Sequence, residues 1–282
     1  MRVLALGSCR IHEPLAAAQR SGEIQYLNRR FRRRYAMFLH DVHEAIQLVR
    51  FACSEIFMPK KLRPFAFERG LRLHRRLTIP FEQAECVVVE GCTDKHYEAA
   101  GWTLNVNEIH RLLVRDGHAA ADEWWQTIDN GYRPSDALVQ AVEAELRARW
   151  RTRWAFGDGH RPVLRELTFR YLPMSEIAEG RRRLQALLAR PLLVVPHVAV
   201  RLPDGSHLAE RLQHVEKTIE AARMIGLPLL DPQTFIERDG QSRVLDKCGT
   251  DFHHYAGDYV PVVGREIVEA LRRSTRADQA CW

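Results

Sequence analysis

The chain has 282 residues, of which 46% are hydrophobic and 28% are charged, and its formal net charge is +6. This length can bury a full α/β core, either as one large domain or as one domain with a sizeable insertion. No apolar run approaches the roughly 18 residues that span a bilayer, and no signal peptide is evident, so we expect a cytoplasmic chain without membrane segments. The six cysteines lack Cys-x-x-Cys spacing, which argues against a zinc ribbon or a disulfide framework.

The densest cationic segment, NRRFRRRYAMF at residues 28–38, interleaves arginines with aromatic residues. Such a segment could pair with phosphates and stack on bases. The remaining arginines alternate with apolar residues, as in EGRRRLQALLAR at 179–190, which is typical of a solvated helix face. No recognised nucleic-acid motif accompanies the charge, so we expect no nucleic-acid partner. The arginines instead suit solvent or an anionic ligand, such as a phosphate-bearing acyl donor.

The first predicted element is a buried strand, RVLAL at residues 2–6, and Gly7 then allows a tight turn into a helix that is evident over Ile11–Ala18. A hydroxyl and a thiol, those of Ser8 and Cys9, therefore lie where a strand ends and a helix begins. Unpaired N–H groups and the helix dipole favour negative charge at such a junction. The sequence thus predicts a site for a nucleophile.

Further strands are predicted at CVVVE (86–90), PLLVVPHV (191–198) and LPLLD (227–231). Helical patterns separate them, at residues 41–52, 105–113, 135–153, 175–189, 207–225 and 259–272. This alternation predicts the α/β class, with a parallel sheet covered by helices on both faces. The interval 99–171 shows helical patterns and no convincing strand, and AFGDGHRP at 155–162 is the expected surface loop. We interpret this interval as a helical insertion in a single domain that spans residues 1–282.

The second informative stretch is KCGTDFHHYAGDYVPVVGREIVEAL, near the carboxyl terminus. Asp251 and His254 are three residues apart, so the carboxylate can orient the imidazole from one side of a turn. The adjacent His253 is expected to point the opposite way. Together with a nucleophile after the first strand, this pair would complete a catalytic triad.

VLALGSCR, followed more than two hundred residues later by DFHHY, resembles the SGNH/GDSL hydrolase superfamily, which opens with an apolar strand plus Gly-Asp-Ser and closes with Asp-x-x-His. The Gly-Ser-Cys form is similar to the GSCFA-like and capsule-biosynthesis relatives. This resemblance implies a flavodoxin-like three-layer α/β/α sandwich, and it aligns Cys9 with the nucleophilic serine. Ser8 stays open as the alternative, since a one-residue shift would aim its hydroxyl at the same space. We expect the helix terminus and a protonated His254 to lower the pKa of Cys9.

Oxyanion donors in the superfamily are a glycine after one strand and an asparagine after the next. Gly91 follows the second strand here, and Thr93 or Asp94 stands where the asparagine is wanted. An ionised carboxylate cannot donate, so the candidates are Thr93 and the amides of Gly91 and Cys92. A polar turn after a buried strand explains the same residues structurally.

We expect three other residues to contribute to oxyanion or substrate binding, namely Gly7, Arg10 and His197. His197 lies at the end of a predicted buried strand. His197 also suits a purely structural role. Because the carboxyl ends of parallel strands share an edge, we expect Gly91, Thr93 and His197 to border one cleft.

Three functions remain open. The first is an esterase or acyltransferase that acts on an ester or thioester, with a small molecule or saccharide as substrate. It requires no cofactor, and the cationic side chains favour a coenzyme A thioester as the acyl donor. The second is a binding protein for an anionic ligand that keeps the fold without turnover. The third is a metal-dependent hydrolase with His197, His253, His254 and Asp251 as ligands, although no recognised metal motif is present. The sequence does not indicate an oligomeric state.

Overall fold

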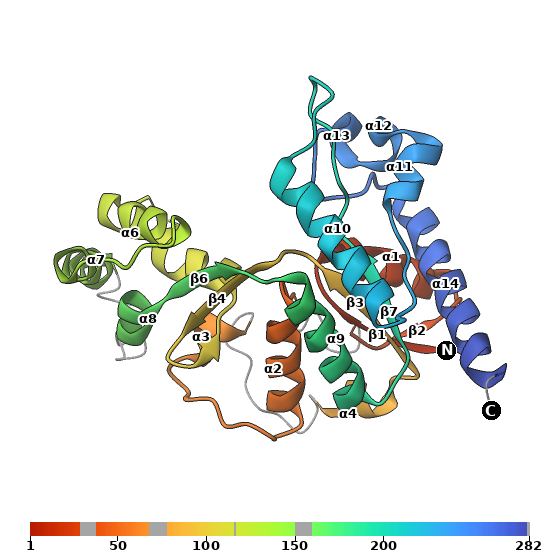
Figure 1. Cartoon of the computed structure of the whole chain (residues 1–282), viewed down its shortest axis with the longest axis horizontal. Coiled ribbons are helices and arrows are strands. Elements are labelled where there is room, and N and C mark those ends of the chain that lie inside the picture. The colour runs from red at the N-terminus through yellow and green to blue at the C-terminus, as the bar shows by residue number, and fades with distance from the viewer. Residues whose placement is uncertain (29–37, 68–77, 116, 150–159, 281–282) are drawn as a thin grey trace. The chain divides into compact units, whose positions relative to one another are not determined.

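The structure is a computed structural model that describes all residues except 29–37, 68–77, 116, 150–159 and 281–282 (Figure 1). The chain divides into two compact units. The sheet unit comprises Met1–Cys53, His74–Asp94 and Pro173–Trp282, and the insert unit comprises Ser54–Leu73 and Lys95–Leu172. Most of the arginine-rich segment 28–38 and of the expected loop 155–162 lies outside the described residues. None of the described helices combines the length and apolar character needed to cross a membrane.

A parallel four-stranded sheet forms the centre of the sheet unit. Its strands are β1 (Arg2–Leu6), β2 (Gln25–Tyr26), β3 (Cys86–Gly91) and β7 (Leu192–Pro196), in the order β2-β1-β3-β7. This order matches the flavodoxin-like arrangement, in which the chain changes direction between the first and third strands. Ligands of such sheets bind at the carboxyl ends of these two strands. Here those ends carry Gly7 and Gly91.

Helices cover both faces of this sheet, as the alternation of strands and helices predicts. On one face lie α1 (Cys9–Arg20) and α14 (Val260–Ala280), which contact each other. The other helical layer contains α2 (Val42–Ala52), α9 (Met174–Leu188) and α10 (Ala209–Met224) (Figure 1). The fold is therefore α/β with three layers.

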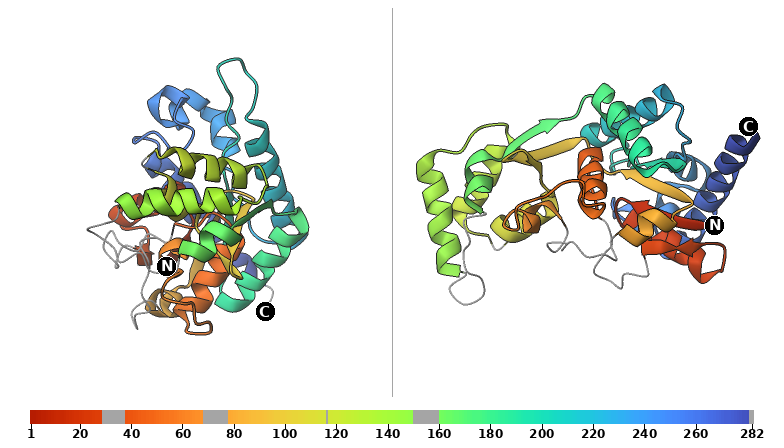
Figure 2. Two further views of the ribbon diagram at one scale, coloured as in Figure 1. Left: turned by 90° about the vertical axis from the view of Figure 1, so that its left-hand side faces the viewer. Right: turned by 90° about the horizontal axis from the view of Figure 1, so that it is seen from below.

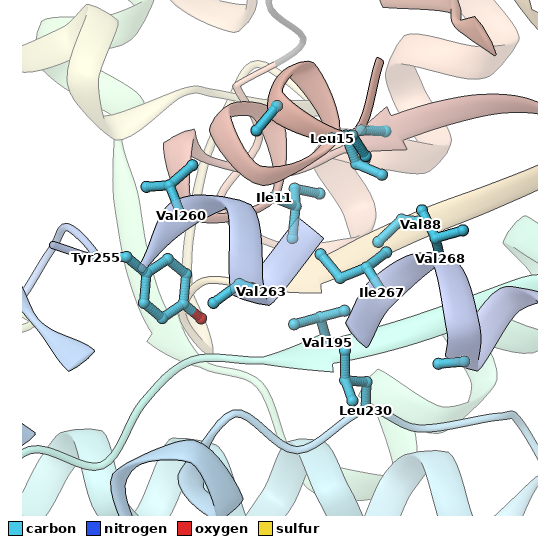
Figure 3. Close-up of a cluster of buried hydrophobic side chains, with 14 of the residues drawn as sticks. Ile11, Leu15, Val88, Val195, Leu230, Tyr255, Val260, Val263, Ile267 and Val268 are labelled. Carbon is cyan, nitrogen blue, oxygen red and sulfur yellow. The ribbon is translucent and has the colours of Figure 1, made fainter. Parts of the chain in front are cut away.

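The core between the sheet, α1 and α14 is mostly aliphatic, with Tyr255 packed among the aliphatic side chains (Figure 3). Because strand side chains alternate between faces, Val88 and Val195 point to this side. Ile11 from α1, and Val263 and Ile267 from α14, pack against them. This packing fixes the amino terminus of α1 at the carboxyl edge of the sheet.

The predicted strands at 2–6, 86–90 and 191–198 are confirmed as β1, β3 and β7. The fourth, at 227–231, forms a single parallel bridge between Leu229 and Val194 and is not a strand. Short helices, α11 (Gln233–Asp239), α12 (Gln241–Val244) and α13 (Asp246–Gly249), then lead to Asp251. Another short helix, α4 (Thr78–Gln83), precedes β3.

The insert unit contains α3 (Arg63–Ala66), α5 (Val106–Ile109), the π-helix η4 (His110–Val114), α6 (Ala119–Asp129), α7 (Asp136–Arg149) and α8 (His160–Glu166). It also contains an antiparallel sheet in the order β5-β4-β6, formed by β4 (Lys95–Ala99), β5 (Trp102–Thr103) and β6 (Thr168–Tyr171). Figure 2 shows α6, α7, α8 and this small sheet in yellow to green, where α6 and α8 lie beside the sheet and α7 packs against both helices. The interpretation of 99–171 as free of strands is therefore wrong. Its strands are short, and mixed charged and aromatic residues hide them.

Candidate functional site

The junction between β1 and α1 is a tight turn at Gly7 and Ser8. Ser8 has extended backbone angles and caps α1, since its hydroxyl accepts a hydrogen bond from the Arg10 amide at 3.3 Å. A Cβ atom on Gly7 would lie 2.5 Å from the Cβ of Glu90, so only glycine fits there. The turn therefore packs directly onto the end of β3.

Glu90 is a buried carboxylate that the sequence analysis did not single out. Its Oε2 accepts a hydrogen bond from the Ser8 amide at 2.6 Å, and within the described residues its Oε1 has no hydrogen-bond partner. The available signal was a charged residue that ends the otherwise apolar run CVVVE. Because the Ser8 amide already donates to Glu90, that amide does not serve as an oxyanion donor in this arrangement.

The segment DFHHY reaches the same edge of the sheet as this junction. The Cys9 thiol lies 3.9 Å from the backbone carbonyl oxygen of His253, to which it donates. The Arg10 guanidinium donates to the carbonyl oxygen of Phe252. The two informative stretches of the sequence, more than two hundred residues apart, are therefore in contact.

Asp251 and His254 form a hydrogen-bonded pair within that segment. The His254 Nδ1 atom lies 3.1 Å from each carboxylate oxygen of Asp251. The His253 amide donates to Asp251 at 2.9 Å and is the main reason that the pKa of Asp251 is lowered to about 2. An ionised carboxylate fixes the imidazole with its proton on Nδ1, which leaves Nε2 available to accept a proton. The His254 side chain is 46% exposed.

The Cys9 thiol does not have the lowered pKa that the sequence analysis expects. Burial raises the pKa of Cys9, and the negative charges of Glu90 and Glu13 raise it further. Arg10 and a hydrogen bond with Ser8 oppose this shift without reversing it. The expectation is wrong because it counted the helix terminus and the imidazole, and missed first the burial of the thiol and then its two acidic neighbours. The thiol is therefore protonated at neutral pH, and attack by its sulfur needs a base.

The backbone at Gly91 and Thr93 contacts neighbouring segments of the sheet unit. A Cβ atom on Gly91 would lie 3.0 Å from both Arg181 and Thr218, so this glycine allows α9 and α10 to pack on β3. The Gly91 carbonyl accepts a hydrogen bond from His214 at 2.9 Å. The Thr93 amide donates to the His40 carbonyl at 3.1 Å. The backbone at these two positions thus has structural contacts that the sequence did not reveal.

His197 does lie beside the DFHHY segment. Its ring centroid is 6.5 Å from that of His253, in an edge-to-face arrangement. The Val198 amide donates to its Nδ1 at 2.8 Å, and burial is the main cause that holds the pKa of His197 well below its usual range. His197 is consequently a neutral, buried neighbour of the site.

Within the described ranges, no group of three or more His, Cys, Asp or Glu side chains is positioned to hold a metal ion. The alternative of a metal-dependent hydrolase therefore has no ligand set in the part of the chain that the structure describes. None of the five described cysteines forms a disulfide bond.

Comparison with known proteins gives one family and one curated relative. The TviD N-terminal domain family matches residues 1–270. The Vi polysaccharide biosynthesis protein TviD of Salmonella typhi is 24% identical over 274 residues, which cover 96% of this chain and 31% of the relative. The chain thus spans less than a third of that relative's length. No solved structure matches the chain.

Proposed function

This chain belongs to the TviD N-terminal domain family, which is related to capsule biosynthesis, and we propose that it is an SGNH-like acyl-handling enzyme that modifies a saccharide. One observation carries the proposal: the Ser8–Cys9 junction contacts the segment that holds the Asp251–His254 pair. The printed name of the relative, a polysaccharide biosynthesis protein, supports a saccharide as the acyl acceptor.

Cys9 is the proposed nucleophile. Its sulfur contacts the DFHHY segment, whereas the Ser8 hydroxyl caps α1. The His254 Nε2 atom accepts the thiol proton while the sulfur attacks the acyl carbon of an ester or thioester. The S–C bond forms, the bond to the leaving group breaks, and the leaving group takes the proton from His254. Asp251 keeps the ring oriented and stabilises the imidazolium.

The second half of the reaction repeats this proton transfer. A saccharide hydroxyl gives its proton to the neutral His254 while its oxygen attacks the acyl carbon of the Cys9 thioester. The new C–O bond forms, the C–S bond breaks, and the thiolate recovers the proton from His254. With water in place of the saccharide, the same steps hydrolyse the donor. Attack by Ser8 would follow the same sequence through an oxygen ester.

A binding protein without turnover is the second candidate. The raised pKa of Cys9 favours it, since a protonated thiol is a poor nucleophile unless a base is correctly placed. This candidate predicts binding of an anionic ligand and no release of acyl group from any donor.

Turnover measurements on variants of the proposed base, His254, and of its partner, Asp251, separate the enzyme from the binding protein. We expect the wild-type chain to release product from an aryl acetate and from acetyl-coenzyme A with an oligosaccharide acceptor. His254→Gln should lower kcat/KM by about 10²–10⁴-fold, because it removes the base. Asp251→Asn should lower it in the same direction by favouring the wrong tautomer.

His118→Gln, a histidine substitution in the insert unit, is the matched control and should leave the rate unchanged. Full activity of His254→Gln would contradict its role as the base. A wild-type chain that turns over none of these donors would favour the binding protein.

A further inference from the structure

Two arginines from different helices converge on one carbonyl oxygen beside Cys9. Arg10, in the first turn of α1, and Arg211, in the first turn of α10, both donate to the carbonyl oxygen of Phe252, the latter at 2.8 Å. A single carbonyl oxygen satisfies only one N–H of each guanidinium, and each guanidinium carries five. The pair therefore has spare donors close to the Phe252 carbonyl oxygen.

Arg10 is almost completely buried, with 3% of its surface exposed. Its Nε and Nη1 atoms are buried and have no hydrogen-bond partner among the described residues. Neither Arg10 nor Arg211 forms an ion pair with a carboxylate in the part of the chain that the structure describes. Burying an uncompensated guanidinium is costly, and natural proteins pair such groups with an anion.

A third donor lies against Arg10. The guanidinium carbon is 5.4 Å from the centre of the Tyr255 ring, and the buried Tyr255 hydroxyl interacts with the Arg10 side chain while donating to no acceptor among the described residues. Burial raises the pKa of Tyr255 to about 12, so the hydroxyl keeps its proton and can donate it in a hydrogen bond. Two unpaired nitrogen atoms of Arg10 and the undonated hydroxyl proton of Tyr255 are thus held close together.

The two arginines act on the ionisable groups around them, and the negative charge of Glu90 opposes them at Tyr255 and Cys9. Burial and Arg10 lower the pKa of Arg211 to about 10. The pKa values of His197 and His253 are also lowered, mainly by burial and further by both arginines. His253 is exposed and Arg211 is half-buried, so the cluster is open to solvent on that side.

We propose that Arg10, Arg211 and Tyr255 form an anion-binding site for a carboxylate or phosphate group of a ligand. Both groups offer several oxygens that accept hydrogen bonds from guanidinium and phenol donors. The site adjoins Cys9, which precedes Arg10 in the chain and contacts the carbonyl of His253. A bound anion would hold the rest of its ligand next to the thiol. Anion binding needs no turnover, so this site stands apart from the proposed acyl transfer.

Titration with inorganic phosphate and with acetate tests the site in the full chain at constant ionic strength. The melting temperature should rise saturably in the wild-type chain, because the anion binds the folded state. Arg211→Gln should raise the apparent Kd about tenfold, the effect of one lost charge-assisted hydrogen bond. Tyr255→Phe, which keeps the ring, should also weaken binding. The anion with the lower Kd identifies the ligand group as phosphate or carboxylate.

Arg223→Gln is the matched control, since it makes the same charge change on the exposed last turn of α10, about 18 Å along the helix. It should keep the wild-type Kd. Equal Kd values in the wild-type chain, Arg211→Gln and Arg223→Gln, or no saturable response in the wild-type chain, would overturn the site. A chain that binds phosphate without acyl transfer would contradict the proposed function alone.

A second readout uses Cys9 itself. Its thiolate displaces iodide from iodoacetate, an anion, or from the neutral iodoacetamide, and peptide mass spectrometry resolves the product at each cysteine. The ratio of the iodoacetate rate to the iodoacetamide rate should be higher at Cys9 than at the exposed Cys53, because the arginine donors bind the carboxylate of iodoacetate beside the thiol. Phosphate should suppress the iodoacetate reaction at Cys9. Equal ratios at the two cysteines would contradict an anion site beside Cys9.

Discussion

At the scale of single residues, Glu90 organises the candidate site. It accepts the hydrogen bond of the Ser8 amide, packs against Gly7 and raises the pKa of Cys9. The sequence alone predicted the Gly-Ser-Cys turn and the Asp-x-x-His pair, because each lies within a few residues. It could not predict the role of Glu90, whose partner amide is 82 positions away along the chain.

The raised pKa of Cys9 leads to a prediction about its alkylation. The rate at which iodoacetamide reacts with Cys9 should rise with pH, and the midpoint of this rise should lie above roughly 8.5, the pKa of a free thiol. Glu13→Gln should lower that midpoint, since it removes one of the negative charges that disfavour the thiolate. Glu13 is exposed, so the substitution should leave the fold intact.

Glu220→Gln on α10 provides the control, as Glu220 is exposed and is not among the groups that act on Cys9. Peptide mass spectrometry gives the rate at Cys9 alone. A wild-type midpoint at or below about 8.5 would show that the thiol is activated after all.

At the scale of secondary-structure elements, the close approach of α1 and α14 holds the junction at the sheet edge. A Cβ atom on Gly264 would lie 2.5 Å from the carbonyl oxygen of Pro14 in α1. This contact is with backbone, so no side-chain rotation relieves it. A glycine in the second turn of α14 is therefore a packing requirement.

Gly264→Ala should lower the free energy of unfolding by about 1–3 kcal/mol, as overpacking does in well-packed cores. Glycine-to-alanine changes in helices and compatible turns ordinarily stabilise proteins, so the expected sign is reversed here. Gly257→Ala, where a Cβ atom meets nothing within 4 Å, is the control and should be neutral or stabilising. Urea unfolding measures both. A Gly264→Ala chain as stable as the wild type would contradict the close packing.

The elements differ in how well the sequence predicts them. Strands β1, β3 and β7 are continuous apolar runs because both of their faces are buried, and such runs are easily recognised. The run at 227–231 looks similar but forms one bridge only. Strands β4, KHYEA, and β6, TFRY, carry charged residues and were missed, since pairing between strands depends on partners far along the chain.

At the scale of the whole molecule, the buried His214 links distant segments and makes folding sensitive to acid. His214 on α10 hydrogen-bonds the Gly91 carbonyl at the end of β3. Burial lowers the pKa of His214, so the folded chain binds fewer protons at this group than the unfolded chain does. Its contribution to stability is therefore present above about pH 6.5 and is lost as the pH falls through that value.

His214→Gln should consequently flatten the pH dependence of stability. Between pH 7.5 and 5.5, the free energy of unfolding of the wild-type chain should fall by up to about 1.4 kcal/mol more than that of the variant. This is the effect expected of one histidine that is neutral in the folded chain and takes up a proton in the unfolded chain. Glutamine can still donate to the Gly91 carbonyl, which limits the loss of structure. Urea unfolding at both pH values measures the difference. Parallel pH profiles for the two proteins would contradict the lowered pKa.

The chain divides into two compact units, and its organisation as a single domain over residues 1–282 stays a prediction. The candidate site belongs wholly to the sheet unit. Its residues come from the first 10 and from residues 211–255 of the chain, with Glu90 between them. The flavodoxin-like strand order brings these parts together at the edge between β1 and β3.

The central claim is that Cys9 carries an acyl group during turnover. Intact-mass spectrometry after incubation with an aryl acetate or acetyl-coenzyme A, followed by peptide mapping, measures this directly. We expect one added acetyl group, located on Cys9 and absent from the Cys9→Ala chain. An acetyl group located on Ser8 would contradict Cys9 as the nucleophile. The absence of any adduct at every pH tested would contradict acyl transfer through either residue.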